Sequence, residues 1–171
     1  MRDGIIRGNH RKIIRVAPTV IAGTTDAGDV MFNATEIPNA VLGNGGCSKL
    51  IGVSITDQDQ ENHNMDLIFM SVQTNLGTAG SAPNITDDDL LAADITSSLR
   101  IVWGNGSTSL GTASSIYTSS GHSDDDDIKQ LPILLQANAG STSVFFTAIA
   151  GGSDIDFANT DDLEFIFHIE Y

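Results

Sequence analysis

The strongest constraint on the fold of this chain is a period-two alternation of apolar residues within short runs. Val30, Phe32 and Ala34 fall on one side of such a run, and residues 163–171 repeat the pattern with apolar residues at every second position. Side chains alternate between the two faces in a β-strand, so this period predicts strands. We expect strands at 11–21, 30–37, 49–55, 65–74, 99–103, 128–137, 143–150 and 163–171, with an edge strand near 116–117.

The composition favours turns over helices. Of the 22 acidic residues 18 are Asp, and Gly, Ser, Thr and Asn together fill 59 of the 171 positions. These residues stabilise turns because their side chains compete for backbone hydrogen bonds or tolerate a positive φ, whereas helices favour Glu, Lys, Ala and Leu. The sequence therefore predicts an all-β protein.

About eight strands without a βαβ rhythm predict an antiparallel β-sandwich, jelly-roll-like in its connections, with at most one short helix. That helix would begin after Thr86 as N-cap, with acidic residues 87–89 complementing its dipole and with Leu90 and Leu91 facing inward. The glycine-rich segment 43–46 is expected to be a hairpin turn, and Pro132 either places its strand at an edge or makes the start of the strand irregular.

Three strands, near 67–70, 144–149 and 165–167, are apolar on both faces. One face of an antiparallel sheet is normally polar, so the surplus predicts that a second copy covers it. We therefore expect a homo-oligomer. The candidate interface residues are Ile68, Met70, Phe146, Ile166 and His168.

Charge divides the chain into two predicted parts, a basic N-terminal arm over residues 1–15 and a single sandwich domain over 16–171. The arm holds five basic residues and one acid, whereas the remainder holds three basic and twenty-one acidic residues. The arm could bind nucleic acid, an acidic protein surface or the acidic body of a neighbouring copy. Direct nucleic-acid binding is disfavoured because the body repels phosphates and the arm lacks an aromatic residue for stacking on bases.

The motifs of enzymes are absent from the sequence. Residues 43–48 lack the Lys and the following helix of a phosphate loop, and Cys47 has no suitably spaced histidine base, so a small buried residue is expected there. Residues 57–68 begin like an EF-hand, but Asn62 stands where Gly is required and Ile68 where Glu is required. We expect no catalytic residues and no cofactor. A minor alternative is a structural calcium ion held by several loops, to which the acidic run 124–127 and the pair Asp154 and Asp156 would contribute.

The acidic, Thr-, Gly- and Asn-rich composition, the basic arm and the C-terminal stretch 131–171 together resemble the decoration, or cement, proteins of tailed bacteriophage capsids. The resemblance implies a non-enzymatic virion protein that binds major capsid protein subunits as a homotrimer and stabilises the shell. In that case Arg2, Arg7, Arg11, Lys12 and Arg15 would contact the capsid. It also implies a position on the outer capsid surface.

Two other functions stay open at this point. A receptor- or glycan-binding module of a fibre or tail would use Trp103, Tyr117 and the loop 104–121 as its platform. A jelly-roll coat protein of a small icosahedral virus would instead place the basic arm on the genome. The start of the sequence does not read as a signal peptide because Arg15 and Pro18 interrupt its apolar run, and no run reaches the length of a membrane span. We therefore expect synthesis in the host cytoplasm and no membrane partner.

Overall fold

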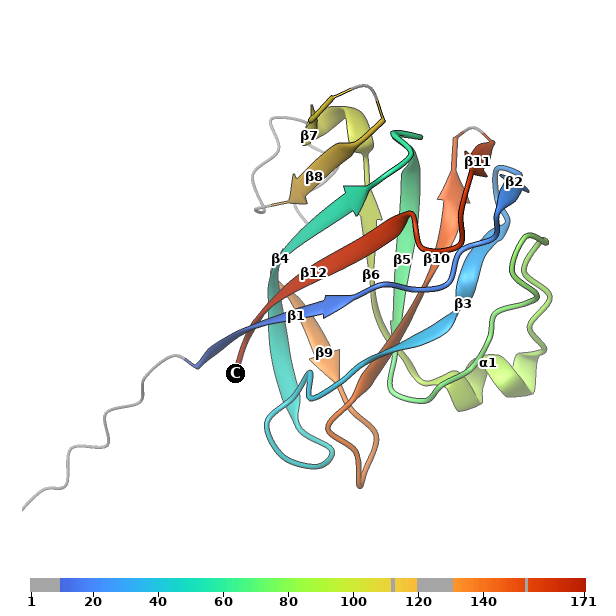
Figure 1. The fold of residues 1–171 in the computed structure, drawn as a ribbon. Coiled ribbons are helices and arrows are strands. Elements are labelled where there is room, and N and C mark those ends of the chain that lie inside the picture. Colours follow the sequence, from blue (N-terminus) through green and yellow to red (C-terminus); the bar gives the residue numbers. More distant parts are fainter. Residues whose placement is uncertain (1–9, 112, 120–130, 153) are drawn as a thin grey trace, which may run out of the picture.

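The computed structural model of the chain describes residues 10–111, 113–119, 131–152 and 154–171. Figure 1 shows two facing layers of strands with one short helix beside them. The strands are β1 (Arg11–Val16), β2 (Gly23–Thr25), β3 (Val30–Ile37), β4 (Cys47–Asp57), β5 (Asn64–Met70), β6 (Ile95–Ile101), β7 (Ser107–Ser109), β8 (Ser115–Ser119), β9 (Ile133–Gln136), β10 (Val144–Gly151), β11 (Ile155–Phe157) and β12 (Leu163–Glu170). The helix is α1 (Asp87–Ala93), and a 3₁₀ turn, η1, spans Trp103–Asn105.

The strand order is that of a jelly roll. Sheet A contains β1-β12-β4 with β9 on the other side of β4, and sheet C contains β3-β10-β5-β6; neighbouring strands are antiparallel. When these eight strands are numbered along the chain, the first pairs with the eighth, the second with the seventh, the third with the sixth and the fourth with the fifth. This is the pairing of one long antiparallel ribbon rolled into two sheets, so the predicted fold is confirmed.

Four short strands extend this framework. β8 follows β9 along the same side of β4, where it pairs with Val53–Asp57, and β7 lies outside β8. β2 and β11 form a separate two-stranded sheet. The sequence pattern did not predict β2, β7 or β11, because three-residue strands are too short to show an alternation.

The core lies between the two sheets and contains a group of phenylalanine rings. Phe146 of β10 stands at its centre, with ring centroids 5.1 Å and 4.9 Å from Phe165 and Phe167 of β12, both in edge-to-face geometry. Phe32 of β3 and Phe69 of β5 pack on the same ring from their own sheet. Each ring stands at an inward-facing position of its strand, where every second residue points into the core. The period-two pattern in the sequence therefore identified these residues.

The apolar surplus on the outer face of sheet C is covered by the chain itself, in contrast to the expectation that a second copy covers it. Met70 and Val30 are fully buried there against Leu76 and Ala93, which come from the segment that follows β5. Phe146 is fully buried between the sheets. Met70 and Phe146 are therefore not available as oligomer contacts, whereas Ile68 is half-buried.

Helix α1 has the predicted cap but not the predicted orientation. The Thr86 Oγ1 accepts a hydrogen bond from the Asp89 backbone N–H at 3.2 Å, as an N-cap does. Leu90 and Leu91 are exposed, however, and Ala93 is the buried residue of the helix. The expectation that the two leucines face inward was wrong, because the helix turns Ala93 toward Met70 and Leu76 and leaves the leucines on its outer side.

One connection differs from its prediction, and one strand start agrees with it. The segment 43–46 is not a hairpin turn, since it carries the chain from β3 in sheet C to β4 in sheet A. The Leu131–Pro132 peptide is cis, and β9 begins directly after it at the edge of β4.

Candidate functional site

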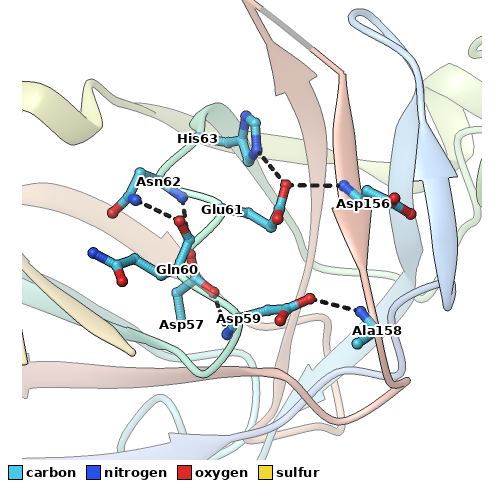
Figure 2. A network of polar contacts seen from close by, with 8 residues as sticks. All are labelled: Asp57, Asp59, Gln60, Glu61, Asn62, His63, Asp156 and Ala158. Atoms are coloured by element: carbon cyan, nitrogen blue, oxygen red, sulfur yellow. Dashed lines mark hydrogen bonds and ion pairs between the residues drawn. The ribbon is translucent and has the colours of Figure 1, made fainter. Parts of the chain in front are cut away.

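A network of carboxylates holds together one end of the sandwich, where β4 leads into β5 (Figure 2). Asp57 is the last inward-facing residue of β4 and is only 2% exposed. Its two carboxylate oxygens accept hydrogen bonds from the backbone N–H groups of Asp59 and Asn62, each at 3.0 Å. Burial raises the pKa of Asp57 above its usual range, and the backbone hydrogen bonds act in the opposite direction.

The same loop is tied by two further carboxylates to β11. The Asp59 Oδ2 accepts the Ala158 N–H at 2.7 Å, and the Glu61 Oε2 accepts the Asp156 N–H at 3.1 Å. Glu61 also contacts the His63 Nε2 at 3.2 Å. β11 pairs with β2 along one side only. On the other side, Glu61 and Asp59 accept the backbone N–H groups of Asp156 and Ala158, which would otherwise lack a partner strand.

The acidic residues of this loop act as hydrogen-bond acceptors that hold the loop in place. Each of Asp57, Asp59 and Glu61 already binds protein N–H groups. Within the described part of the chain, no three His, Cys, Asp or Glu side chains come together as a metal-ligating group. The acidic run 124–127, which was a candidate contributor to a calcium site, lies outside the described residues.

The two aromatic residues of the predicted glycan platform are not at the surface. Trp103 is 2% exposed and packs on Tyr117, which is also buried, with ring centroids 5.5 Å apart. Both rings belong to the core between the sheets, so neither can stack on a sugar. The indole Nε1 of Trp103 has no hydrogen-bond partner among the described residues.

The outer face of sheet A carries the residues that remain accessible. Ile13 on β1 is 62% exposed, and Ile166 and His168 on β12 are half-buried. All three alternate with inward-facing core residues, so they share the outward side of the sheet. The prediction that Ile166 and His168 share a face is consistent with this placement, and their role as oligomer contacts stays a prediction.

A shallow groove of about 280 Å³ lies at one end of the same face. Its lining residues are Cys47, Ser48, Lys49, Leu134, Glu170 and Tyr171. The Tyr171 hydroxyl donates to the Asn39 carbonyl at 2.6 Å, and burial raises the pKa of this phenol. Cys47 is exposed at the start of β4, which corrects the expectation of a small buried residue.

The predicted basic arm belongs partly to the sandwich. Sheet A begins at Arg11, so Arg11, Lys12 and Arg15 lie in β1, and Arg2 and Arg7 lie outside the described residues. The Arg11 Nε lies 3.3 Å from a Glu170 oxygen, and the Arg15 Nη1 lies 3.0 Å from a Glu164 oxygen. These exposed ion pairs leave both guanidinium groups at the surface, where each pair contributes on the order of 0.2–1 kcal/mol.

Sequence reasoning missed Asp57 and the groove for different reasons. A single Asp after a strand has the same local appearance whether it is solvated or buried, although its place in the inward phase of β4 was a usable signal. The groove is formed by β4, β9 and β12, which are distant in sequence, so only the strand order brings its walls together.

Comparison with known proteins places no relative beside this chain: no family model and no curated protein matches it. Among the described residues, no helix combines the length and the apolar character needed to cross a membrane.

Proposed function

We propose that this protein is a non-enzymatic structural protein of a virion, which decorates a bacteriophage capsid by binding its major capsid protein as a homo-oligomer. The observation that carries the proposal is the charge division between a basic N-terminal segment and a strongly acidic jelly-roll body. Jelly rolls are common in viral capsid proteins, and this support is an analogy of fold. The resemblance implies a trimer at the outer surface of the capsid, which stays a prediction.

The mechanism of stabilisation follows from mass action. A protein that binds assembled capsid subunits, and not free ones, lowers the free energy of the assembled state. An oligomer presents several identical contacts at once, so weak contacts add through a high effective concentration. The acidic, Lys-poor surface of the body, with three Lys residues in the whole chain, favours solubility of the decorated particle.

The contact to the shell is proposed for the N-terminal segment that precedes β1, which carries Arg2 and Arg7. A deletion that tests this segment must end before β1, because Ile14 is a buried core residue and the strand pairs with β12 along its whole length. Deletion of residues 2–9 leaves Arg11, Lys12 and Arg15 in place and removes Arg2 and Arg7.

The experiment is capture of the purified protein by capsids that lack it, followed by sedimentation of the particles. We expect the full chain to co-sediment with heads and the 2–9 deletion to bind at least about tenfold more weakly, because two of five basic residues are lost. Far-UV circular dichroism of both proteins serves as the folding control. Undiminished capture by the deletion would refute the contact, and absence of capture by the full chain would refute the function.

Two other functions remain as outcomes of separate tests. A receptor- or glycan-binding role needs a platform other than Trp103 and Tyr117, and saturable binding on a glycan array would favour it. A role as the coat protein of a small icosahedral virus requires the N-terminal segment to bind the genome. Strong, salt-dependent nucleic-acid binding would favour that role.

A further inference from the structure

The two sheets of the sandwich differ in how their outer faces are covered. The segment between β5 and β6 packs Leu76 and Ala93 on sheet C. On sheet A, the described residues place no helix against β12 or β4, and Figure 1 shows α1 beside the other layer. The outer face of sheet A is therefore the sheet surface open to a partner in the described part of the chain.

The outward side chains of this face form a ridge beside a furrow. The ridge follows β12 and consists of Ile166, His168 and Glu170. The furrow follows the neighbouring strand β4, where the residues directly opposite are Ser54, Gly52 and Lys49. A large side chain on β12 is therefore paired with a small residue on β4 at two successive outward positions, Ile166 with Ser54 and His168 with Gly52. Ser54 is only 9% exposed and Gly52 is buried, so both lie low between the larger side chains.

The ridge and the furrow are complementary to each other. Consider a two-fold axis that lies on the surface of sheet A, runs parallel to the strands and passes midway between β12 and β4. Rotation about this axis places β12 of the second copy over β4 of the first, and residues that are paired across the two strands in one copy face each other between the copies. Ile166 of each copy then meets Ser54 of the other, and His168 meets Gly52. A surface that fits itself in this way is the requirement for an isologous dimer.

Charge supports the same arrangement. Lys49 has no ion pair among the described residues, and the two-fold axis places it against Glu170 of the second copy. Arg11, which is next to Glu170 in β1, comes to lie over the exposed Leu134 of β9, at the groove. The same alignment of the two copies therefore brings opposite charges together and places large side chains against small ones.

We infer that the outer face of sheet A is a self-association surface, on which a second copy of this chain packs through the β12 ridge and the β4 furrow. The inference rests on the homo-oligomer of the proposed function, and it specifies a two-fold pair where the resemblance implies a trimer. The face is about four strands wide and six residues long, which corresponds to a flat area on the order of 400 Å² per copy. Over both copies this amounts to about 800 Å², below the about 1,200 Å² of standard specific interfaces, so we expect a weak, transient dimer with a dissociation constant in the upper micromolar range.

Sedimentation velocity of the full chain over a micromolar concentration series tests the inference. We expect a monomer–dimer equilibrium, and Ile166→Glu should raise the dissociation constant at least about thirtyfold because it places a charge under the second copy. Ile95→Glu is the matched control, since Ile95 is an exposed strand isoleucine on the other sheet. Far-UV circular dichroism and urea midpoints establish that both variants fold.

A charge exchange tests the register. Lys49→Glu and Glu170→Lys should each weaken self-association, because each variant faces a like charge in its own pair. A mixture of the two variants should form a heterodimer, since both contacts then join opposite charges. A purely structural effect of either substitution would not produce this recovery.

A monomer at every concentration would overturn the inference, and so would a dimer or trimer that tolerates Ile166→Glu. Failure of the mixture to recover association would overturn the proposed register. Head capture reports separately on the proposed function: a dimer that no capsid captures would refute decoration and leave the self-association surface intact.

Discussion

Replacement of Asp57 by Ala should destabilise the protein more than replacement of any other acid in its loop. The carboxylate accepts two backbone N–H groups inside the fold, and a hydrogen bond to a charged group contributes about 1.5–3 kcal/mol. Relief of the buried charge offsets part of this loss. We therefore expect a decrease of about 2–4 kcal/mol in the free energy of unfolding, or about 4–16 °C in Tm for a chain of this size.

The assay is urea denaturation followed by fluorescence of Trp103, which is the sole tryptophan and is buried next to Tyr117. Asp59→Ala serves as the matched control, because Asp59 is half-buried and accepts one backbone N–H. It should lose about 1 kcal/mol. A loss below about 1 kcal/mol for Asp57→Ala, or equal losses in the two variants, would refute the view that Asp57 anchors this loop.

Four further predictions follow from single side chains. Because burial raises the pKa of Asp57, the folded state binds the proton of this carboxyl more tightly than the unfolded state does. The resulting contribution to stability falls as the pH rises above 3.8 through the folded pKa. Asp57→Asn should remove this pH dependence in urea titrations at a series of pH values. Phe146→Ala should cost about 3–5 kcal/mol in the same assay, since the ring is fully buried among four others. Thr86→Ala should cost about 1 kcal/mol through loss of the N-cap, and a calorimetric Tm unchanged from the wild type would contradict that role. Cys47 should react with a thiol reagent in the native protein as fast as in urea, and strong protection in the native state would contradict its exposure.

The fold was largely predictable because its strands present one face to a core. In β12, Leu163, Phe165, Phe167 and Ile169 are all buried, as the period of two required. The order of the strands was not predictable in the same way, since pairing such as that of β1 with β12 joins residues at opposite ends of the chain.

Burial on the outer face of sheet C was the main failure of sequence reasoning. Met70 lies on the face of its strand that points away from the core between the sheets. The sequence could not show whether a second copy or the same chain would cover this side chain. The cover is Leu76 and Ala93, which stand in a segment rich in Gly, Ser, Asn and Asp. An apolar residue that stands alone in such a segment carries no periodic signal.

The candidate surface on sheet A was predictable in part. The positions of Ile166 and His168 outside the core follow from the alternation along β12. Their placement opposite Ser54 and Gly52 depends on the register between β12 and β4, which has a bulge near His168. A bulge shifts every later pair, so residue pattern alone does not give these neighbours.

The central claim, decoration of a capsid, is tested most directly by quantitative mass spectrometry of purified particles from the source culture, which reads the copy number of this protein against the major coat protein. Decoration predicts a number comparable to that of the coat protein subunits or a simple fraction of it, with residues 1–9 present. A few copies per particle would assign the protein to a tail or fibre. Its absence from particles would contradict the virion function altogether.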